Sequence, residues 1–131
     1  MLDIYKFLKE ADTFYLATVE EGRPCVRPFG TVNIFEGKLY VQTGKRKAVF
    51  QQLQADPHAE LCASFDGATL RINGKLIDDN RYEAKKSMLL AYPNLCGTYN
   101  ENDDNTRVLY FQDATATFTY LDHRDSKVVN F

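Results

Sequence analysis

The sequence predicts a mainly β fold in which short antiparallel strands form a small closed or partly closed barrel with a few helices around it. Segments rich in β-branched and aromatic residues recur through most of the chain. Glycine-containing turns separate many of them, and these turns are too short for the crossovers that parallel strands need. Closing the sheet removes the exposed edges that many short strands would otherwise present.

The expected elements begin with a short helix, because Ile4, Phe7, Leu8 and Ala11 recur at the spacing of one helical face. The strands predicted next cover residues 14–19, 25–32, 33–35, 38–42, 60–65 and 68–77. Three dipeptides mark tight turns by placing glycine where a positive φ is required: Glu21-Gly22, Glu36-Gly37 and Asp66-Gly67.

Two more helices are expected. One begins after Lys47 and stops at Asp56-Pro57. The other covers residues 81–91, with Asn80 as its N-cap and Glu83 reaching back to it.

Near the C-terminus, alternating Ala, Thr and aromatic residues over 114–120 predict a strand with one buried face, and residues 108–111 are expected to be its hairpin partner. The polar, acidic segment 97–106 is interpreted as a solvated loop.

Length and charge narrow the class of protein. The 131 residues fit a single domain over 1–131, with 44% hydrophobic and 26% charged residues. A net charge of -2 argues against a general nucleic-acid binder. No long apolar run predicts a signal peptide or a membrane span. Three widely spaced cysteines favour reduced thiols, so we expect a cytoplasmic protein without a disulfide frame or metal site.

The most informative local feature is a run of cations at a helix start. Thr43 and Gly44 end a strand, and Lys45, Arg46 and Lys47 lead into the helix that follows. Free N–H groups and the positive end of the helix dipole would complete a phosphate site there. A solvated basic turn explains the same residues equally well. The glycine spacings of the common nucleotide loops are absent.

The order of these segments resembles the flavin-binding split-barrel family, the pyridoxamine 5'-phosphate oxidase-like proteins. The resemblance covers residues 12–91 best and includes F-Y-L-A-T-V, R-P-F-G, K-L-Y-V-Q-T, the basic turn with Lys47 and V-F-Q-Q-L-Q-A-D-P-H-A-E-L-C. It implies a six-stranded antiparallel split β-barrel and a homodimer, with FMN bound in a groove shared between the two chains.

The resemblance also implies site residues. The FMN phosphate maps onto Thr43, Lys45, Arg46 and Lys47, of which Lys47 is the strongest candidate. The flavin ring maps onto Arg27, Pro28 and Phe29, with Gln42 as a polar contact. A cation at Arg27 would favour the anionic reduced flavin. Without the resemblance, Arg27 reads as an outward surface residue and Phe29 as a core or dimer-contact side chain.

The C-terminal segment L-D-H-R-D-S-K-V-V-N-F departs from the founding enzymes, because His123 precedes Arg124 and no Arg-x-His segment is completed. Vitamin B6 oxidation therefore does not follow from the resemblance. His58 and His123 also have no partners at metal or hydrolase spacing.

These features lead to two main hypotheses and a third. The first is an FMN-dependent oxidoreductase that moves hydride or electrons between a donor such as a reduced nicotinamide and a small-molecule substrate. The second is a carrier or redox sensor that binds flavin, haem or a deazaflavin, and the third is an interaction protein with an empty groove. The sequence identifies no catalytic acid or base, because several tyrosines are equivalent candidates: Tyr40, Tyr92, Tyr99 and Tyr110.

Overall fold

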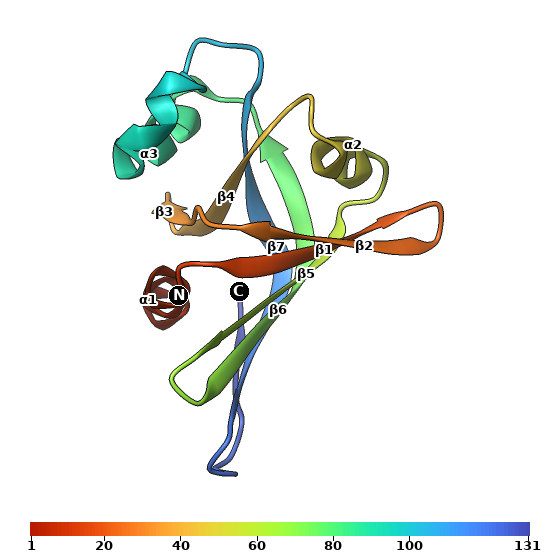
Figure 1. The fold of residues 1–131 in the computed structure, drawn as a ribbon, viewed down its shortest axis with the longest axis vertical. Coiled ribbons are helices and arrows are strands. Elements are labelled where there is room, and N and C mark those ends of the chain that lie inside the picture. Colours follow the sequence, from red (N-terminus) through yellow and green to blue (C-terminus); the bar gives the residue numbers. More distant parts are fainter.

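The computed structural model describes all 131 residues, whose strands form one antiparallel sheet (Figure 1). The elements are α1 (Leu2–Ala11), β1 (Phe14–Glu20), β2 (Arg23–Phe29), β3 (Asn33–Phe35), β4 (Lys38–Gly44), α2 (Ala48–Ala55), β5 (His58–Phe65), β6 (Ala68–Asp79), α3 (Tyr82–Ala91), the 3-10 helix η1 (Pro93–Gly97), β7 (Thr106–Tyr120) and β8 (Lys127–Asn130). The strand order is β2-β1-β5-β6-β7-β4-β3, with β8 paired to β7.

The mainly β, antiparallel prediction is confirmed, but the sheet has eight strands rather than six. The N-terminal half of β7 pairs with β4, and its C-terminal half pairs with β8 along the same edge. The short C-terminal strand β8 therefore occupies an edge that β4 leaves free. The three predicted glycine turns are confirmed, and both residues of each turn have positive φ.

The hairpin predicted between residues 108–111 and 114–120 is wrong, because both segments belong to the continuous strand β7. Asp113 has a φ of +52°, which suits a turn but here forms a β-bulge. Asp113 and Ala114 together lie opposite Gly74 where the register with β6 shifts. A Cβ at Gly74 would lie 2.9 Å from the Ala114 backbone, so only glycine fits there without movement.

All three predicted helices are present, but the N-cap of α3 is not the expected one. Arg81 is the N-cap and makes no side-chain capping bond. The side-chain oxygen Oδ1 of Asn80 instead accepts a hydrogen bond from the Arg107 guanidinium of β7. The predicted capping residue is therefore used to tie the start of α3 to the sheet.

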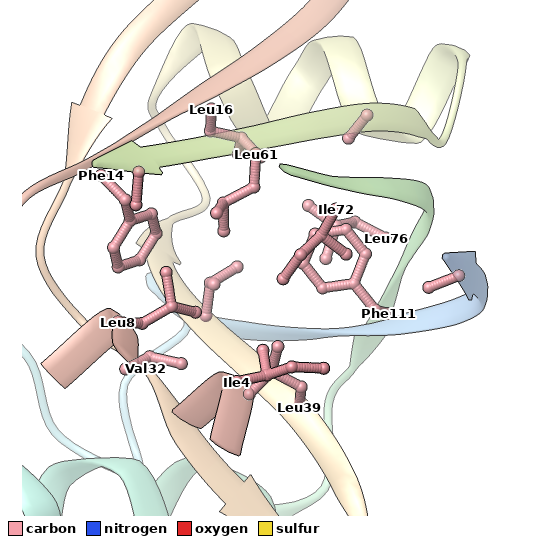
Figure 2. Close-up of a cluster of buried hydrophobic side chains, with 14 of the residues drawn as sticks. Ile4, Leu8, Phe14, Leu16, Val32, Leu39, Leu61, Ile72, Leu76 and Phe111 are labelled. Carbon is pink, nitrogen blue, oxygen red and sulfur yellow. The ribbon is translucent and has the colours of Figure 1, made fainter. Parts of the chain in front are cut away.

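The main core contains 21 buried hydrophobic residues from the strands, α1, α2 and the link between β2 and β3 (Figure 2). In Figure 2 Ile4 and Leu8 of α1 point toward Phe14, Val32 and Leu39. Both helix side chains are essentially fully buried, and burying such a residue contributes about 1.5–3 kcal/mol.

The helices α2 and α3 contact opposite faces of the paired strands β4 and β7. Val49, Phe50 and Leu53 of α2 join the main core together with Val41 and Leu109. The neighbouring strand residues Tyr40 and Val108 point the other way and pack with Ala84 and Met88 of α3. The C-terminal end of β4 therefore lies between the two helices. No helix has both the length and the apolar character needed to cross a membrane.

Candidate functional site

A hollow of about 180 Å³ lies where the end of β2, the link to β3, the end of β4 and the start of α2 meet. Its lining consists of Arg27, Pro28, Phe29, Gly30, Thr31, Gln42, Thr43, Lys47 and Val49. Six of the eight residues predicted for the flavin site are among them. The other two, Lys45 and Arg46, do not line the hollow.

Arg27 points inward from β2 rather than outward, so the interpretation of it as a surface residue is wrong. Its Nη1 donates to Thr18 Oγ1 at 2.7 Å and to the Leu16 carbonyl oxygen at 3.2 Å. Its Nη2 donates to Gln52 Oε1 of α2 at 2.6 Å. These bonds hold β2 against β1 and α2, and they fix the position of the guanidinium at the hollow.

All the hydrogen-bond acceptors of Arg27 are neutral, and no carboxylate pairs with it. Burial lowers the pKa of this half-buried guanidinium, but an arginine stays charged at any ordinary pH. Its positive charge is therefore uncompensated beside the hollow, where a bound anion would be favoured.

Lys47 is the N-cap of α2, with extended backbone and no side-chain capping bond. Its side chain is exposed and makes no ion pair or hydrogen bond. The first N–H groups of a helix lack partners within it, and the dipole is positive at this end. Thr43 is buried at the end of β4 and also lines the hollow. A hydroxyl, an ammonium group and a helix start therefore meet at one place.

Lys45 and Arg46 are held instead by the acidic segment 97–106, the light-blue connection to β7 at the top of Figure 1. Lys45 Nζ donates to Asp104 at 3.0 Å, and its backbone N–H donates to the Asn105 carbonyl oxygen at 2.7 Å. The Arg46 N–H donates to Asn105 Oδ1 at 3.2 Å. The segment predicted as a plain solvated loop thus packs on the basic turn.

The sequence prediction missed three residues that line the hollow: Gly30 and Thr31 in the link to β3, and Val49 of α2. The Thr31 hydroxyl accepts the Gln42 N–H at 3.2 Å. Beside it, the Tyr92 hydroxyl accepts the Val32 N–H at 3.0 Å and donates to the Val32 carbonyl oxygen at 3.1 Å. Gly30-Thr31 follows Phe29 directly, so its position beside the predicted ring contacts was a usable signal. The sequence around Val32 does not indicate its contact with Tyr92, which lies 60 residues further along the chain.

The outward face of β1 and β2 beside the hollow is apolar. Tyr15 pairs across the strands with Pro28, and Ala17 pairs with Val26. Tyr15 and Val26 remain 52% and 69% exposed. Phe29 points the other way, half-buried, with its ring 6.2 Å from that of Phe14. An apolar surface therefore borders the hollow on the side of Pro28.

The lining of the hollow contains two cations, hydroxyl and amide groups and backbone, but no acidic residue. It also contains no His, Cys, Met or Tyr. Such a set can bind a phosphate or another anion through charge-assisted hydrogen bonds. The structure has no group of three or more His, Cys, Asp or Glu residues placed to hold a metal ion.

Known proteins resemble this chain both in a family model and in solved structures. The family model described as pyridoxamine 5'-phosphate oxidase matches residues 3–119. A NimC/NimA family protein from Clostridium acetobutylicum is 35% identical, with a TM-score of 0.94 over 100% of this chain and 93% of that chain. No curated protein matches the chain.

Two more distant structures share the fold. A pyridoxamine 5'-phosphate oxidase-related, FMN binding protein from Nostoc punctiforme is 18% identical, with a TM-score of 0.68 over 98% of this chain and 94% of that chain. A heme binding protein from Mycobacterium smegmatis is 14% identical, with a TM-score of 0.66 over 94% of this chain and 57% of that chain. The match of the family model over most of the sequence shows that the chain belongs to the pyridoxamine 5'-phosphate oxidase family and has its split-barrel fold.

Proposed function

We propose that this protein binds FMN at the hollow and acts as an oxidoreductase that transfers hydride or electrons from a reduced donor to a small molecule. One observation carries the proposal: the hollow is lined by Arg27 and Lys47, neither of which has a carboxylate partner, and by no acidic residue. A phosphate dianion suits such a lining, because each bond to it is charge-assisted.

The residues present divide into two groups. Thr43, Lys47 and the start of α2 would hold the phosphate. Arg27, Pro28 and Phe29 would lie along the ring, with Gln42 as a polar contact. Gln42 Nε2 donates one hydrogen bond to the Thr43 carbonyl oxygen at 3.1 Å, so its second N–H and the side-chain oxygen remain to bind a ligand.

A bound flavin would supply the redox chemistry, and the chain would supply position and charge. Arg27 contributes through its fixed charge rather than through mobile contacts, because four acceptors of its own chain hold the guanidinium. A fixed positive charge in a partly buried place stabilises negative charge that develops nearby. Arg27 should therefore raise the reduction potential of a flavin bound beside it.

A second copy of the chain would complete the site. The hollow of about 180 Å³ is smaller than the roughly 300–1,000 Å³ of most small-molecule sites. The apolar face with Tyr15 and Val26 borders the hollow and offers a surface on which a symmetric partner could pack. Light scattering of the flavin-loaded protein should therefore give the mass of a dimer, and a loaded monomer would contradict the shared site.

The alternative is a carrier or redox sensor of the same fold. A related fold binds heme in the Mycobacterium smegmatis protein. The lining of this hollow offers none of the usual axial ligands of haem iron, which are His, Cys, Met and Tyr. The observations therefore favour a phosphorylated flavin over haem.

Anaerobic stopped-flow absorbance tests the enzymatic part of the proposal. A reduced nicotinamide should reduce the bound FMN with a rate that saturates, since hydride transfer requires the donor to be held in contact with the ring. Arg27→Ala, checked for folding, should slow this step or lower the flavin potential. If the donors tested reduce bound FMN no faster than free FMN, the oxidoreductase proposal fails and the carrier alternative is favoured.

A further inference from the structure

Gln52 is a buried amide on the side of α2 that packs against β1 (Figure 1). The other buried side chains of α2 are apolar and join the main core: Val49, Phe50 and Leu53. A glutamine in such surroundings needs partners for its polar atoms, because an unpaired amide is costly to bury. The hydrogen bonds of Gln52 therefore indicate its role.

Gln52 completes a ring of hydrogen bonds with Arg27 and Thr18. Arg27 Nη2 donates to Gln52 Oε1 at 2.6 Å, and Arg27 Nη1 donates to Thr18 Oγ1 at 2.7 Å. The Thr18 hydroxyl donates in turn to Gln52 Oε1 at 2.5 Å. Both partners of Arg27 are buried side chains on regular elements, the strand β1 and the helix α2. The guanidinium is therefore held by two neutral groups that have little freedom to move.

The amide nitrogen of Gln52 faces an acid. Gln52 Nε2 donates to Glu20 Oε2 at 3.5 Å, which is long for a hydrogen bond, and Glu20 is an exposed residue. Arg27 itself has only neutral acceptors. The Gln52 amide thus contacts the cation through its oxygen and the acid through its nitrogen, while the two charged groups do not pair with each other.

A neutral side chain next to Arg27 is not what stability alone would favour. Charges that are removed from water in proteins are usually paired with an opposite charge. Glutamate has nearly the shape of glutamine, and its carboxylate could accept the same bonds from Arg27 and Thr18, with the bond from Arg27 strengthened by charge. Glutamine instead leaves the positive charge of Arg27 uncompensated beside the hollow.

We propose that Gln52 is a positioning residue of the flavin site, which fixes Arg27 without neutralising it and thereby keeps the reduction potential of the bound flavin high. This inference rests on the proposal that FMN binds at the hollow. Reduction makes the flavin ring more negative, and a fixed cation beside the ring favours that form. A carboxylate in place of the Gln52 amide would cancel much of this effect, because it would lie one hydrogen bond from the guanidinium.

Redox titration of the FMN-loaded protein tests this role with two matched variants. Gln52→Glu introduces a carboxylate against Arg27, whereas Gln54→Glu introduces the same charge at an exposed position of α2. Gln52→Glu should reduce the preference for reduced over oxidised FMN about tenfold or more, which for a two-electron couple lowers the potential by about 30 mV or more. Gln54→Glu should leave the potential nearly unchanged.

Gln52→Met separates the charge from the hydrogen bond. It removes the acceptor but adds no negative charge, and Arg27 retains its bonds to Thr18 and to the Leu16 carbonyl oxygen. The potential should therefore fall less than in Gln52→Glu. An equal or larger fall in Gln52→Met would overturn the claim that the neutrality of Gln52 sets the potential.

A measurement without flavin shows whether the introduced carboxylate reaches Arg27. In apo-protein carrying Gln52→Glu, NMR should give the new carboxyl group a pKa below its usual value of about 4.3, because the guanidinium favours the charged form. Circular dichroism checks the fold, and Glu20→Gln/Gln52→Glu repeats the titrations without the neighbouring acid. A pKa at or above the usual value in both variants would contradict the pairing with Arg27 and overturn the inference.

The outcomes also distinguish this inference from the proposed function. If wild-type apo-protein binds no FMN, the proposed function fails and the role of Gln52 fails with it. If the wild type binds FMN but Gln52→Glu and Gln54→Glu have equal potentials, the role of Gln52 alone is overturned.

Discussion

The hollow and the corner formed by the end of β6, the start of β7 and the basic turn after β4 both contain cations, but the surroundings of these cations differ. Around the hollow, Arg27 and Lys47 have no carboxylate partner. At the corner, Lys45 pairs with Asp104 at 3.0 Å, and Arg107 lies 3.7 Å from Asp78 and 3.9 Å from Asp104. The basic run Lys45-Arg46-Lys47 is therefore not one site, because its first and last members belong to different places. The proposed function therefore places the phosphate at the hollow, where the cations have no acidic neighbours, and not at the corner, where carboxylates already pair with them.

The largest expected effect comes from replacing Lys47 and Lys45 separately, which tests whether the two lysines belong to different places. Lys47→Ala should weaken FMN binding by about 1.5–3 kcal/mol, because it removes a charge-assisted contact to the phosphate. Lys45→Ala is the matched control and should leave FMN affinity nearly unchanged, since Asp104 already holds that side chain. Titration of each apo-protein with FMN, followed by flavin fluorescence, measures both. Equal losses in the two variants would mean that the basic turn acts as a unit.

A second variant tests the register of β6 on β7, the strand that carries Arg107. Gly74→Ala would force a Cβ within 2.9 Å of the Ala114 backbone at the bulge that sets the register of β6 on β7. We expect a loss of about 1–3 kcal/mol in the free energy of unfolding, as for other overpacked sites. Urea unfolding measures it, with Gly97→Ala as the control, because a Cβ at Gly97 meets no atom. An unchanged stability would show that β7 moves away from the added Cβ without cost, so that the bulge does not require glycine.

The smallest expected effects on stability concern Asp78 and its neighbour Asp79 at the end of β6. Burial by itself would raise the pKa of Asp79, but hydrogen bonds from Arg81 and Tyr40 outweigh it and lower the pKa. Burial raises the pKa of Asp78, and Arg107 and Lys85 offset this only in part. The two carboxyl groups should therefore contribute to stability with opposite dependence on pH.

The sign follows from linkage between protonation and folding. The lowered pKa of Asp79 gives stability that is complete above the ordinary value of 3.8 and is lost as pH falls through its lower folded value. The raised pKa of Asp78 gives stability that is present below 3.8 and is lost as pH rises through its higher folded value. Asp79→Asn should therefore cost most near neutral pH, whereas Asp78→Asn should gain on the wild type as pH rises.

Urea unfolding from about pH 3 to about pH 7 checks both trends. Because each effect involves one carboxyl group, we expect Asp78→Asn to change stability by about 1 kcal/mol or less. Parallel curves for the two variants would contradict the different environments of the two residues.

Much of the fold could be predicted because its signals are local. Acid-glycine pairs locate three turns, and alternating residues locate the strands they connect. The error in β7 had a local cause too, since Asp113 adopts the left-handed conformation of a turn residue inside a strand. The strand β8 was missed because four residues with one half-buried member carry little pattern.

The candidate site was predictable to the extent that its residues are neighbours in sequence. The R-P-F-G stretch and Lys47 were found through the order of motifs, and the structure brings them together with Gln42 and Thr43. The separation of Lys45 from Lys47 could not be predicted, because it depends on Asp104, 59 residues away. The role of Asn80 was misread for the same reason, since its partner Arg107 lies 27 residues further along the chain.

A crystal structure of the protein grown with FMN tests the central claim most directly. The account predicts two chains related by a twofold axis and the phosphate within hydrogen-bond distance of Lys47 and Thr43. It also predicts the ring along Arg27, Pro28 and Phe29. A flavin phosphate bound at Lys45 and Arg107, or a flavin enclosed by one chain alone, would contradict it.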